Sequence, residues 1–162
     1  MSVLEHPAVL RVQAALLDKG SAAAVVELDE EASTAQSAAA ALGVDLGAIV
    51  KSLVFTIDGD AVMALIAGDR RCDTKALPQT FGRQGLVMRP DAERVREATG
   101  FAIGGVAPLG HPASLATAID DSLGRFDVIY AAAGHPRCVF PTTVLELSLL
   151  TGGVMARGLT TT

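Results

Sequence analysis

The stretch IVKSLVFTIDGDAVMALIA, residues 49–67, carries a strong signal for a β-hairpin. Residues 49–57 and 61–67 are apolar runs of strand length, and the Asp58-Gly59 pair between them is typical of a two-residue hairpin turn. The second run is apolar on both faces, which is characteristic of a strand in the middle of a sheet. The sequence therefore predicts an antiparallel hairpin whose second strand is central in its sheet.

Lys51 stands out within the first of these strands. Because side chains alternate along a strand, Lys51 shares a face with Leu53 and Phe55, and the opposite face is also largely apolar. A lysine in so apolar a strand needs an anionic or polar partner. Two interpretations follow: a functional lysine, or a lysine near a strand end whose ammonium reaches water.

Helical and strand patterns alternate irregularly on both sides of the hairpin. Helices are predicted at residues 7–19, 35–42, 73–80, 90–98 and 141–151, and strands at residues 24–28, 86–88, 115–119, 126–133 and 138–140. In the first helix, the predicted apolar face comprises Val9, Leu10, Val12, Leu16 and Leu17. We expect one α+β domain over residues 1–162, with a mixed, mostly antiparallel sheet and flanking helices.

Composition excludes several classes of protein. Half of the 162 residues are hydrophobic and 19% are charged, so the chain can form a sizeable core, and no run is long enough to predict a membrane span. The formal net charge is −5 and only 4% of residues are aromatic, which argues against a DNA-binding protein or a base-stacking surface. We expect no signal peptide, and the isolated Cys72 and Cys138 suggest a reduced, cytoplasmic setting.

A glycine-rich loop, TGFAIGGVAPLGH at residues 99–111, is the predicted active site. It holds four glycines and a proline, yet it also carries Phe101, Ile103, Val106 and Leu109, which tie it to a core. An ordered loop of this kind presents backbone N–H groups, which bind an anion or a carbonyl oxygen that gains negative charge.

A charged cluster follows the second hairpin strand. It contains Asp69, Arg70, Arg71, Asp73 and Lys75. Aspartate favours turns and helix caps, so local chain reversal accounts for the cluster. A small basic patch for a phosphate group is the alternative.

The histidines and cysteines point to no familiar catalytic arrangement. His111 and His135 each lie between a glycine and a proline, hence in loops, where either could act as a general base, but no serine or cysteine is spaced for a triad with them. Metal-ligand spacing is absent, so we expect no metal site. Cys72 and Cys138 are interpreted as small core residues. Without a phosphate-binding or dinucleotide-binding glycine motif, we expect no cofactor.

The lysine strand and the glycine loop, about fifty residues apart, resemble the YbaK/prolyl-tRNA-synthetase-associated domain family over roughly residues 5–157. The matching segments are Thr34-Ala35, Ala38-Ala39, Leu42-Gly43, residues 49–55, Gly68-Asp69, Thr99-Gly100-Phe101, Gly104-Gly105-Val106, Pro108, Gly110 and residues 132–134. The resemblance implies a single mixed α/β domain that hydrolyses the ester of wrongly charged tRNA, without a side-chain nucleophile.

The resemblance also implies a set of site residues. Lys51 matches the lysine tied to activity, and residues 104–108 match the family's GxxxP loop, whose amides in Gly104, Gly105 and Val106 would stabilise the oxyanion. Lys51 would bind the phosphate of the terminal adenosine or orient the aminoacyl group. The predicted substrate-binding residues are Phe55, Asp69, Arg70, Ile103, Ala107, Pro108 and His135.

Two functions remain open at this point. The first is a trans-editing hydrolase for mischarged tRNA, most simply tRNA for proline carrying alanine, cysteine, serine or threonine. The second is a non-catalytic module that binds a nucleotide or small metabolite in the same pocket. The expected partners are the 3′ end of an aminoacyl-tRNA, bound weakly because the chain is acidic, prolyl-tRNA synthetase, and a second copy of the chain in a homodimer.

Overall fold

The predicted hairpin is present and lies within the largest sheet of the fold. In the computed structural model, which describes residues 2–162, β2 (Val50–Ile57) and β3 (Asp60–Ala67) pair antiparallel from Val50↔Ala67 to Ile57↔Asp60. Asp58 and Gly59 both have positive φ, at 49° and 86°, as the two central residues of a type I′ turn require. The turn residues and the strand pairing therefore both match the hairpin predicted from the sequence.

Strand β3 is the central strand of a five-stranded sheet, as its sequence predicts. The sheet order is β5-β2-β3-β6-β9, in which β2 and β5 are antiparallel neighbours, whereas β6 and β9 are added in parallel. A separate three-stranded antiparallel sheet has the order β1-β8-β7, and β4 and β10 form a small two-stranded sheet. The bounds are β1 (Val26–Glu27), β4 (Arg71–Cys72), β5 (Val87–Met88), β6 (Ala116–Asp120), β7 (Ile129–Ala132), β8 (Cys138–Thr142), β9 (Val154–Ala156) and β10 (Thr160–Thr161).

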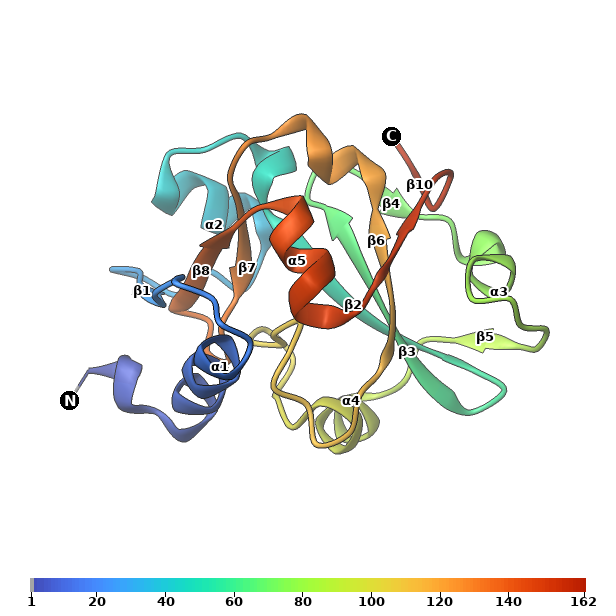
Figure 1. Ribbon diagram of the computed structural model, residues 1–162, viewed down its shortest axis with the longest axis horizontal. Helices are drawn as coiled ribbons and strands as arrows, with labels where there is room; N and C mark the ends of the chain where they lie inside the picture. Colours follow the sequence, from blue (N-terminus) through green and yellow to red (C-terminus); the bar gives the residue numbers. More distant parts are fainter. Residues whose placement is uncertain (1) are drawn as a thin grey trace.

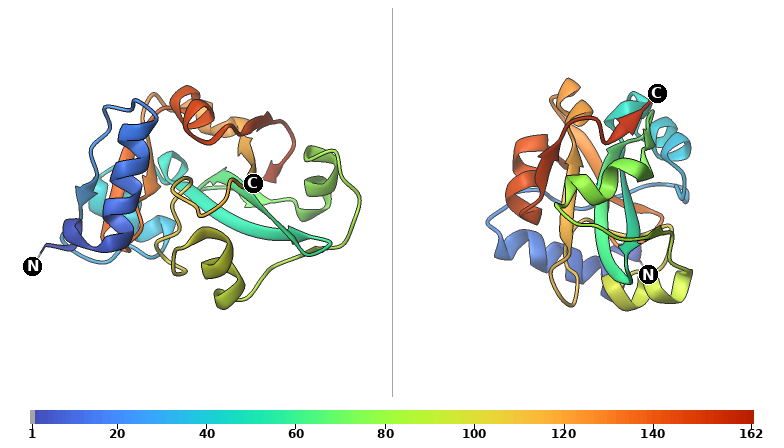
Figure 2. Two further views of the ribbon diagram at one scale, coloured as in Figure 1. Left: turned by 60° about the horizontal axis from the view of Figure 1, so that its bottom comes forward. Right: turned by 90° about the vertical axis from the view of Figure 1, so that its right-hand side faces the viewer.

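Helices surround the two larger sheets, as Figures 1 and 2 show. Most begin at a side-chain cap and several end at a glycine with positive φ; Thr34, for example, accepts from the N–H of Ser37, and Gly43 follows the last turn. The helices are α1 (Pro7–Asp18), α2 (Ala35–Leu42), α3 (Leu77–Thr80), α4 (Ala92–Thr99) and α5 (Val144–Thr151), and short 3₁₀ turns lie at η1 (Val3–Glu5), η2 (Leu46–Ala48), η3 (Thr74–Ala76) and η4 (Asp121–Arg125).

The two faces of the hairpin are buried in different apolar clusters. Val50, Val54 and Met63 belong to the larger cluster, which includes residues of α1, α5 and the three-stranded sheet. Phe55 and Ile66 belong to a second cluster, which includes residues of α3 and of the C-terminal segment. The alternation predicted for the hairpin is therefore confirmed, and the fold is the predicted α+β domain with mostly antiparallel strand pairs.

Several predicted bounds and one predicted face are wrong. The strands predicted at residues 24–28 and 126–133 shorten to β1 and β7, and no pattern predicted β4, β9 or β10. These pairs are only two or three residues long, so tertiary contacts rather than local pattern define them. On α1, Leu10 and Leu17 are 53% and 67% exposed, because the helix packs on the core through a narrower stripe that contains Val12.

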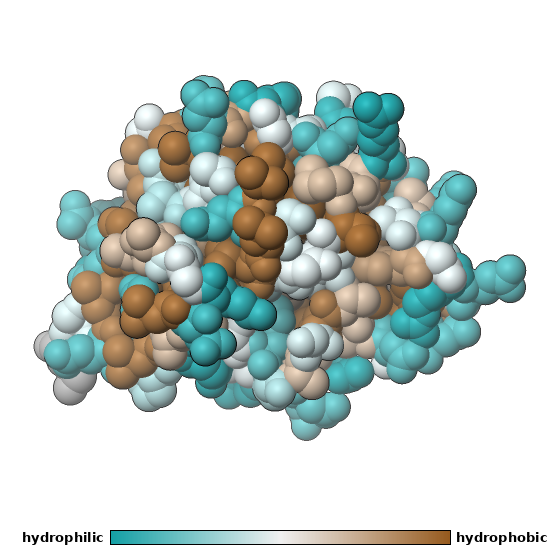
Figure 3. Space-filling view, viewed as in Figure 1, coloured by the Kyte–Doolittle hydropathy of each residue, from teal (hydrophilic) through white to brown (hydrophobic). Residues whose placement is uncertain are grey.

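The outer side of α5 is apolar and exposed. Leu145 and Leu149 lie one helical turn apart and are 72% and 75% exposed. A hydrophobic band crosses the middle of the molecular face in Figure 3, where α5 lies in Figure 1. Among the described helices, none is long and apolar enough to cross a membrane.

Candidate active site

A cavity of about 410 Å³ lies where the two larger sheets approach each other. Its wall is formed by the start of α2, the first half of β2, the glycine loop, and β7 and β8 with the turn that joins them. A cavity of this size, mostly apolar with a few polar groups, is typical of small-molecule sites in proteins. The lining residues that carry polar side chains are Ser33, Thr34, Gln36, Lys51, Ser52, Arg89, Tyr130 and His135.

One wall of the cavity is an unpaired strand edge. On the side away from β3, β2 pairs with β5 only at Thr56 and Ile57, and a single bridge joins Ile49 to Tyr130. The N–H of Gly68 donates to the carbonyl of Ile49 at 2.8 Å, so odd-numbered residues of β2 direct their backbone polar groups towards β3. The backbone N–H and C=O of Ser52 therefore face the open edge.

Lys51 lies at this wall, half-buried, and its ammonium has a polar partner as the sequence requires. Nζ donates to the backbone carbonyl of Arg70 at 2.6 Å. Burial lowers the pKa of Lys51 and the nearby Arg71 lowers it further, while Asp69 and Cys72 act in the opposite direction. A carbonyl neutralises no charge, so this ammonium retains the capacity to attract an anionic or carbonyl group in the cavity.

The glycine loop is ordered by its own hydrogen bonds. The Thr99 hydroxyl donates to the carbonyl of Val95 and accepts from the N–H of Phe101, and the N–H of Gly105 donates to the carbonyl of Ala102 at 3.1 Å. A turn within the loop therefore already uses the N–H group of Gly105, one of the three predicted oxyanion donors.

Two other amides of the loop are available. Within the described residues, the N–H groups of Gly104 and Val106 have no hydrogen-bond acceptor, and both residues line the cavity. Gly104 has φ +97°, a conformation that a side chain would strain. N–H groups that line a cavity and have no acceptor in the protein can donate to an oxygen atom of a ligand, so this pair is suited to such an atom.

Close backbone packing holds the loop against its neighbours. A Cβ on Gly105 would lie 2.9 Å from the backbone of Gly134 and His135, and a Cβ on Gly134 would lie 2.8 Å from the backbone of Ala8. Three chain segments are thus stacked at distances that exclude side chains. Glycine at residues 105 and 134 thus lets the loop pack closely against the β7–β8 turn, and that turn against α1.

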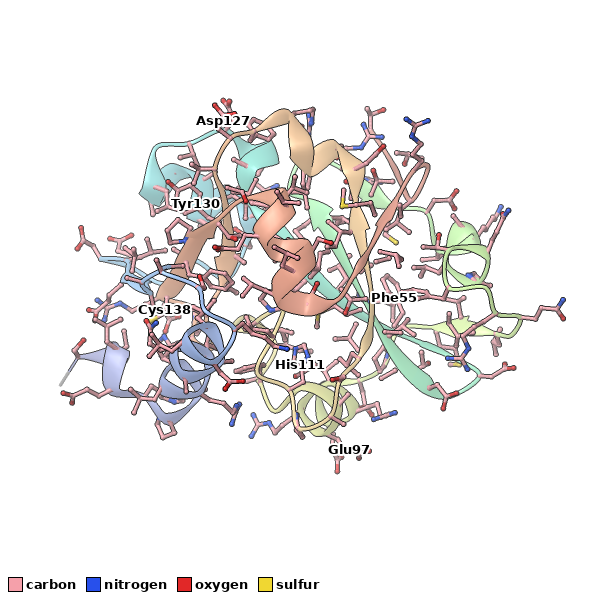
Figure 4. The ribbon with its side chains drawn as sticks, viewed as in Figure 1. Phe55, Glu97, His111, Asp127, Tyr130 and Cys138 are labelled. Atoms are coloured by element: carbon pink, nitrogen blue, oxygen red, sulfur yellow. The ribbon has the colours of Figure 1, made fainter. Side chains whose placement is uncertain are left out.

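His111 fastens the end of the loop rather than lining the cavity. Its Nε2 donates to the carbonyl of Ala107 at 2.8 Å, and its ring meets that of Phe101 edge to face. Burial lowers the pKa of His111, an effect that the Ala107 carbonyl partly offsets. The ring lies beneath α5 in the view of Figure 4.

Of the other predicted substrate-binding residues, Ile103 and His135 line the cavity. Ile103 is 63% exposed. His135 Nδ1 accepts from the N–H of Arg137 at 3.1 Å, which leaves Nε2 to carry the proton of the neutral ring. Ala107 and Pro108, in the same loop, are buried and are not part of the cavity wall.

Three more predicted residues lie outside the cavity. The Asp69 carboxylate binds Arg125 through two hydrogen bonds of 2.9 and 2.8 Å, and the Arg70 guanidinium binds Thr160. Phe55 is in the second apolar cluster, well apart from Tyr130 and Cys138 in Figure 4. None of the three therefore lines this cavity, and ion pairing, anchoring of the C-terminal segment and core packing account for these side chains.

Arg89, Tyr130 and Ser52 line the cavity and were not predicted. Arg89 is exposed in the short segment between β5 and α4. Its guanidinium lies over the Phe55 ring, 4.9 Å from the ring centroid, and it forms no ion pair with any described residue. No local pattern separates it from other surface arginines, because only the tertiary structure brings it to β2.

Neither cysteine is an activated nucleophile. Burial raises the pKa of the Cys72 thiol to about 11, and burial also raises that of Cys138. Both observations agree with the interpretation of these residues as small core side chains.

Comparison with known proteins gives the family. Residues 29–149 match the model of the aminoacyl-tRNA editing domain. YwhH of Bacillus subtilis, an uncharacterised protein, is 38% identical over 76% of this chain and 78% of its own length. A protein from Enterococcus faecalis named "Putative Cys-tRNA(Pro)/Cys-tRNA(Cys) deacylase EbsC" is 29% identical over 65% of this chain and 64% of its own length.

Solved structures agree with this result. One, "Crystal structure of a putative trans-editing enzyme for prolyl tRNA synthetase", is 42% identical to this chain and superposes with a TM-score of 0.86, covering 93% of this chain and 95% of that one. The family model spans about three quarters of the chain and includes both the β2 strand and the glycine loop. This chain therefore belongs to the aminoacyl-tRNA editing domain family and is an aminoacyl-tRNA deacylase.

Proposed function

We propose that this protein hydrolyses the ester bond between tRNA for proline and a small, wrongly attached amino acid such as alanine, cysteine, serine or threonine. The observation that carries the proposal is the pair of free amides at Gly104 and Val106, which line the same cavity as Lys51. The relatives named for prolyl-tRNA synthetase and for Cys-tRNA(Pro) support the choice of tRNA.

The proposed mechanism needs no side-chain nucleophile, because an aminoacyl ester is already reactive. Water attacks the ester carbonyl, and the oxygen that gains negative charge accepts from the N–H groups of Gly104 and Val106. The bond between the carbonyl carbon and the ribose oxygen then breaks, and the ribose oxygen takes up the proton that the attacking water loses. Lys51 orients the aminoacyl end or binds the phosphate of the terminal nucleotide through its ammonium group.

The acidic composition is compatible with a substrate held mainly by its end. A net charge of −5 opposes extended contact with the tRNA backbone, so affinity for tRNA should be weak and salt-sensitive. Delivery by prolyl-tRNA synthetase would offset that weakness, and the synthetase is the partner that we propose.

The test is a deacylation panel. tRNA for proline charged with alanine, cysteine, serine, threonine or proline is incubated with wild type and with Lys51→Ala, with free tRNA release as the readout. We expect hydrolysis of at least one small non-cognate residue, sparing of prolyl-tRNA, and a loss of roughly a hundredfold in Lys51→Ala. Binding of a nucleotide without hydrolysis of any charged tRNA would instead support the non-catalytic module.

A further inference from the structure

The hydroxyl of Ser52 is buried without a hydrogen-bond partner. Among all buried side-chain oxygen and nitrogen atoms of residues 2–162, it is the one without a donor or acceptor in reach. A buried polar atom normally has a partner, and an exception in a native structure requires an explanation. Ser52 lines the cavity, so a ligand can supply what the protein does not.

The position of Ser52 on β2 places it close to the chemistry. It neighbours Lys51 in sequence, points to the opposite face of the strand, and directs its backbone N–H and C=O to the open edge of β2. No hydrogen bond holds the hydroxyl in its buried position, so rotation about one side-chain torsion can turn it towards the cavity.

The surroundings of Ser52 restrict the kind of group it can bind. Val50 and Val54, which share its face, and Val95 and Val106 belong to one apolar cluster and line the same cavity. An ammonium group brought here would be desolvated with a single acceptor, which is unfavourable. A neutral hydroxyl or thiol loses far less hydration and can exchange one hydrogen bond with Ser52.

We infer that Ser52 is a specificity-determining residue that binds the side-chain hydroxyl or thiol of the aminoacyl group, so that serine, threonine and cysteine are preferred to apolar residues of the same size. This inference rests on the proposed deacylase function and narrows its substrate class. A site that hydrogen-bonds a substrate hydroxyl rejects the analogue that lacks it, because its own polar group then remains unpaired.

The sharpest test compares two residues of nearly equal shape. Serine and 2-aminobutyrate differ by a hydroxyl in place of a methyl group, so their kcat/KM ratio on tRNA for proline isolates the hydrogen bond. We expect wild type to favour seryl-tRNA by about tenfold or more, and Ser52→Ala to reduce this preference to within about threefold. Ser114→Ala, at an exposed serine outside the cavity, is the matched control and should keep the wild-type ratio.

Thermal unfolding gives a second, independent readout. Because the Ser52 hydroxyl is unpaired in the free protein, Ser52→Ala should unfold at the same temperature as wild type or a higher one. A marked fall in the midpoint, or failure of this variant to fold, would show that the hydroxyl has a structural partner and would overturn the inference.

The outcomes separate the two levels of the proposal. Wild type that hydrolyses 2-aminobutyryl-tRNA as fast as seryl-tRNA, or a Ser52→Ala variant that retains the preference, overturns the role of Ser52 and leaves the deacylase intact. Wild type that hydrolyses no small-residue tRNA overturns the proposed function, and the inference about Ser52 with it.

Discussion

The ammonium of Lys51 donates to the backbone carbonyl of Arg70 at 2.6 Å, and this bond joins the cavity wall to the turn between β3 and β4. The Arg70 side chain in turn donates to Thr160 at 2.7 Å, so the same residue anchors the C-terminal segment. Arg70 thus contributes its backbone to the site and its side chain to the fold. The position of Lys51 therefore depends on a contact between residues 19 apart in the sequence.

The free amides of the glycine loop predict a separation of stability from activity. Gly104→Ala should cost about 1–2 kcal/mol of unfolding free energy because its φ of +97° is unfavourable for alanine, and it should lower kcat by roughly tenfold or more by displacing the donors. Gly82→Ala is the matched control: φ is +63° in an exposed turn with open space around it. Its stability cost should be similar, and equal activity losses in the two variants would contradict the role of the loop.

The Asp69–Arg125 pair predicts that Asp69→Asn retains activity. The hydrogen bond from Arg125 lowers the pKa of Asp69, and both side chains are more than one-third exposed, so solvent screening limits the pair to less than about 1 kcal/mol. That contribution is present above the ordinary aspartate pKa and is lost as pH falls through the lowered value. We expect Asp69→Asn to deacylate within twofold of the wild-type rate, and we expect its difference from wild type in thermal unfolding midpoint to shrink in acid. A tenfold fall in kcat/KM would return Asp69 to the substrate site.

His111 predicts a pH-dependent stability. Because its folded-state pKa is lowered, the unfolded chain binds a proton first as pH falls through the ordinary histidine value. The stability that the neutral buried ring contributes to the fold is therefore fully present above about pH 6.5. It is lost as pH falls from that value through the lowered pKa. His111→Gln, which can still donate to the Ala107 carbonyl, should show a smaller fall in midpoint between pH 8 and pH 5 than wild type, as measured by thermal scans in matched ionic strength. Parallel pH curves would exclude this role.

Arg89 predicts a salt-sensitive contribution to substrate binding. Its unpaired guanidinium at the cavity rim can contact a phosphate, so Arg89→Ala should raise KM for aminoacyl-tRNA several-fold, leave kcat nearly unchanged and flatten the dependence of KM on salt. Arg83→Ala is the control, since Arg83 already pairs with Asp60 at 2.6 Å. Steady-state kinetics at two salt concentrations distinguish the variants, and an identical KM for both would remove Arg89 from the substrate path.

Local sequence was sufficient for the hairpin and for the order of the loop. Asp58-Gly59 can form a tight turn with two positive φ angles, and alternation along residues 50–57 determines which side chains enter each apolar cluster. Glycines mixed with Phe101 and Val106 likewise require an ordered loop tied to the core. These features depend on neighbours within a few residues, and the sequence alone therefore predicts them.

Only the tertiary structure decided which residues meet at the cavity. Strand β2 has an open edge because β5 is too short to cover it. Ser52, Arg89 and Tyr130, which come from separate segments of the chain, line the cavity at this edge. Conversely, Asp69 and Arg70 lie next to the site in sequence, yet Arg125 and Thr160 occupy their side chains. Hydrogen bonds and ion pairs form between whichever groups the packed sheets bring within about 3 Å, and spacing along the chain does not encode that encounter.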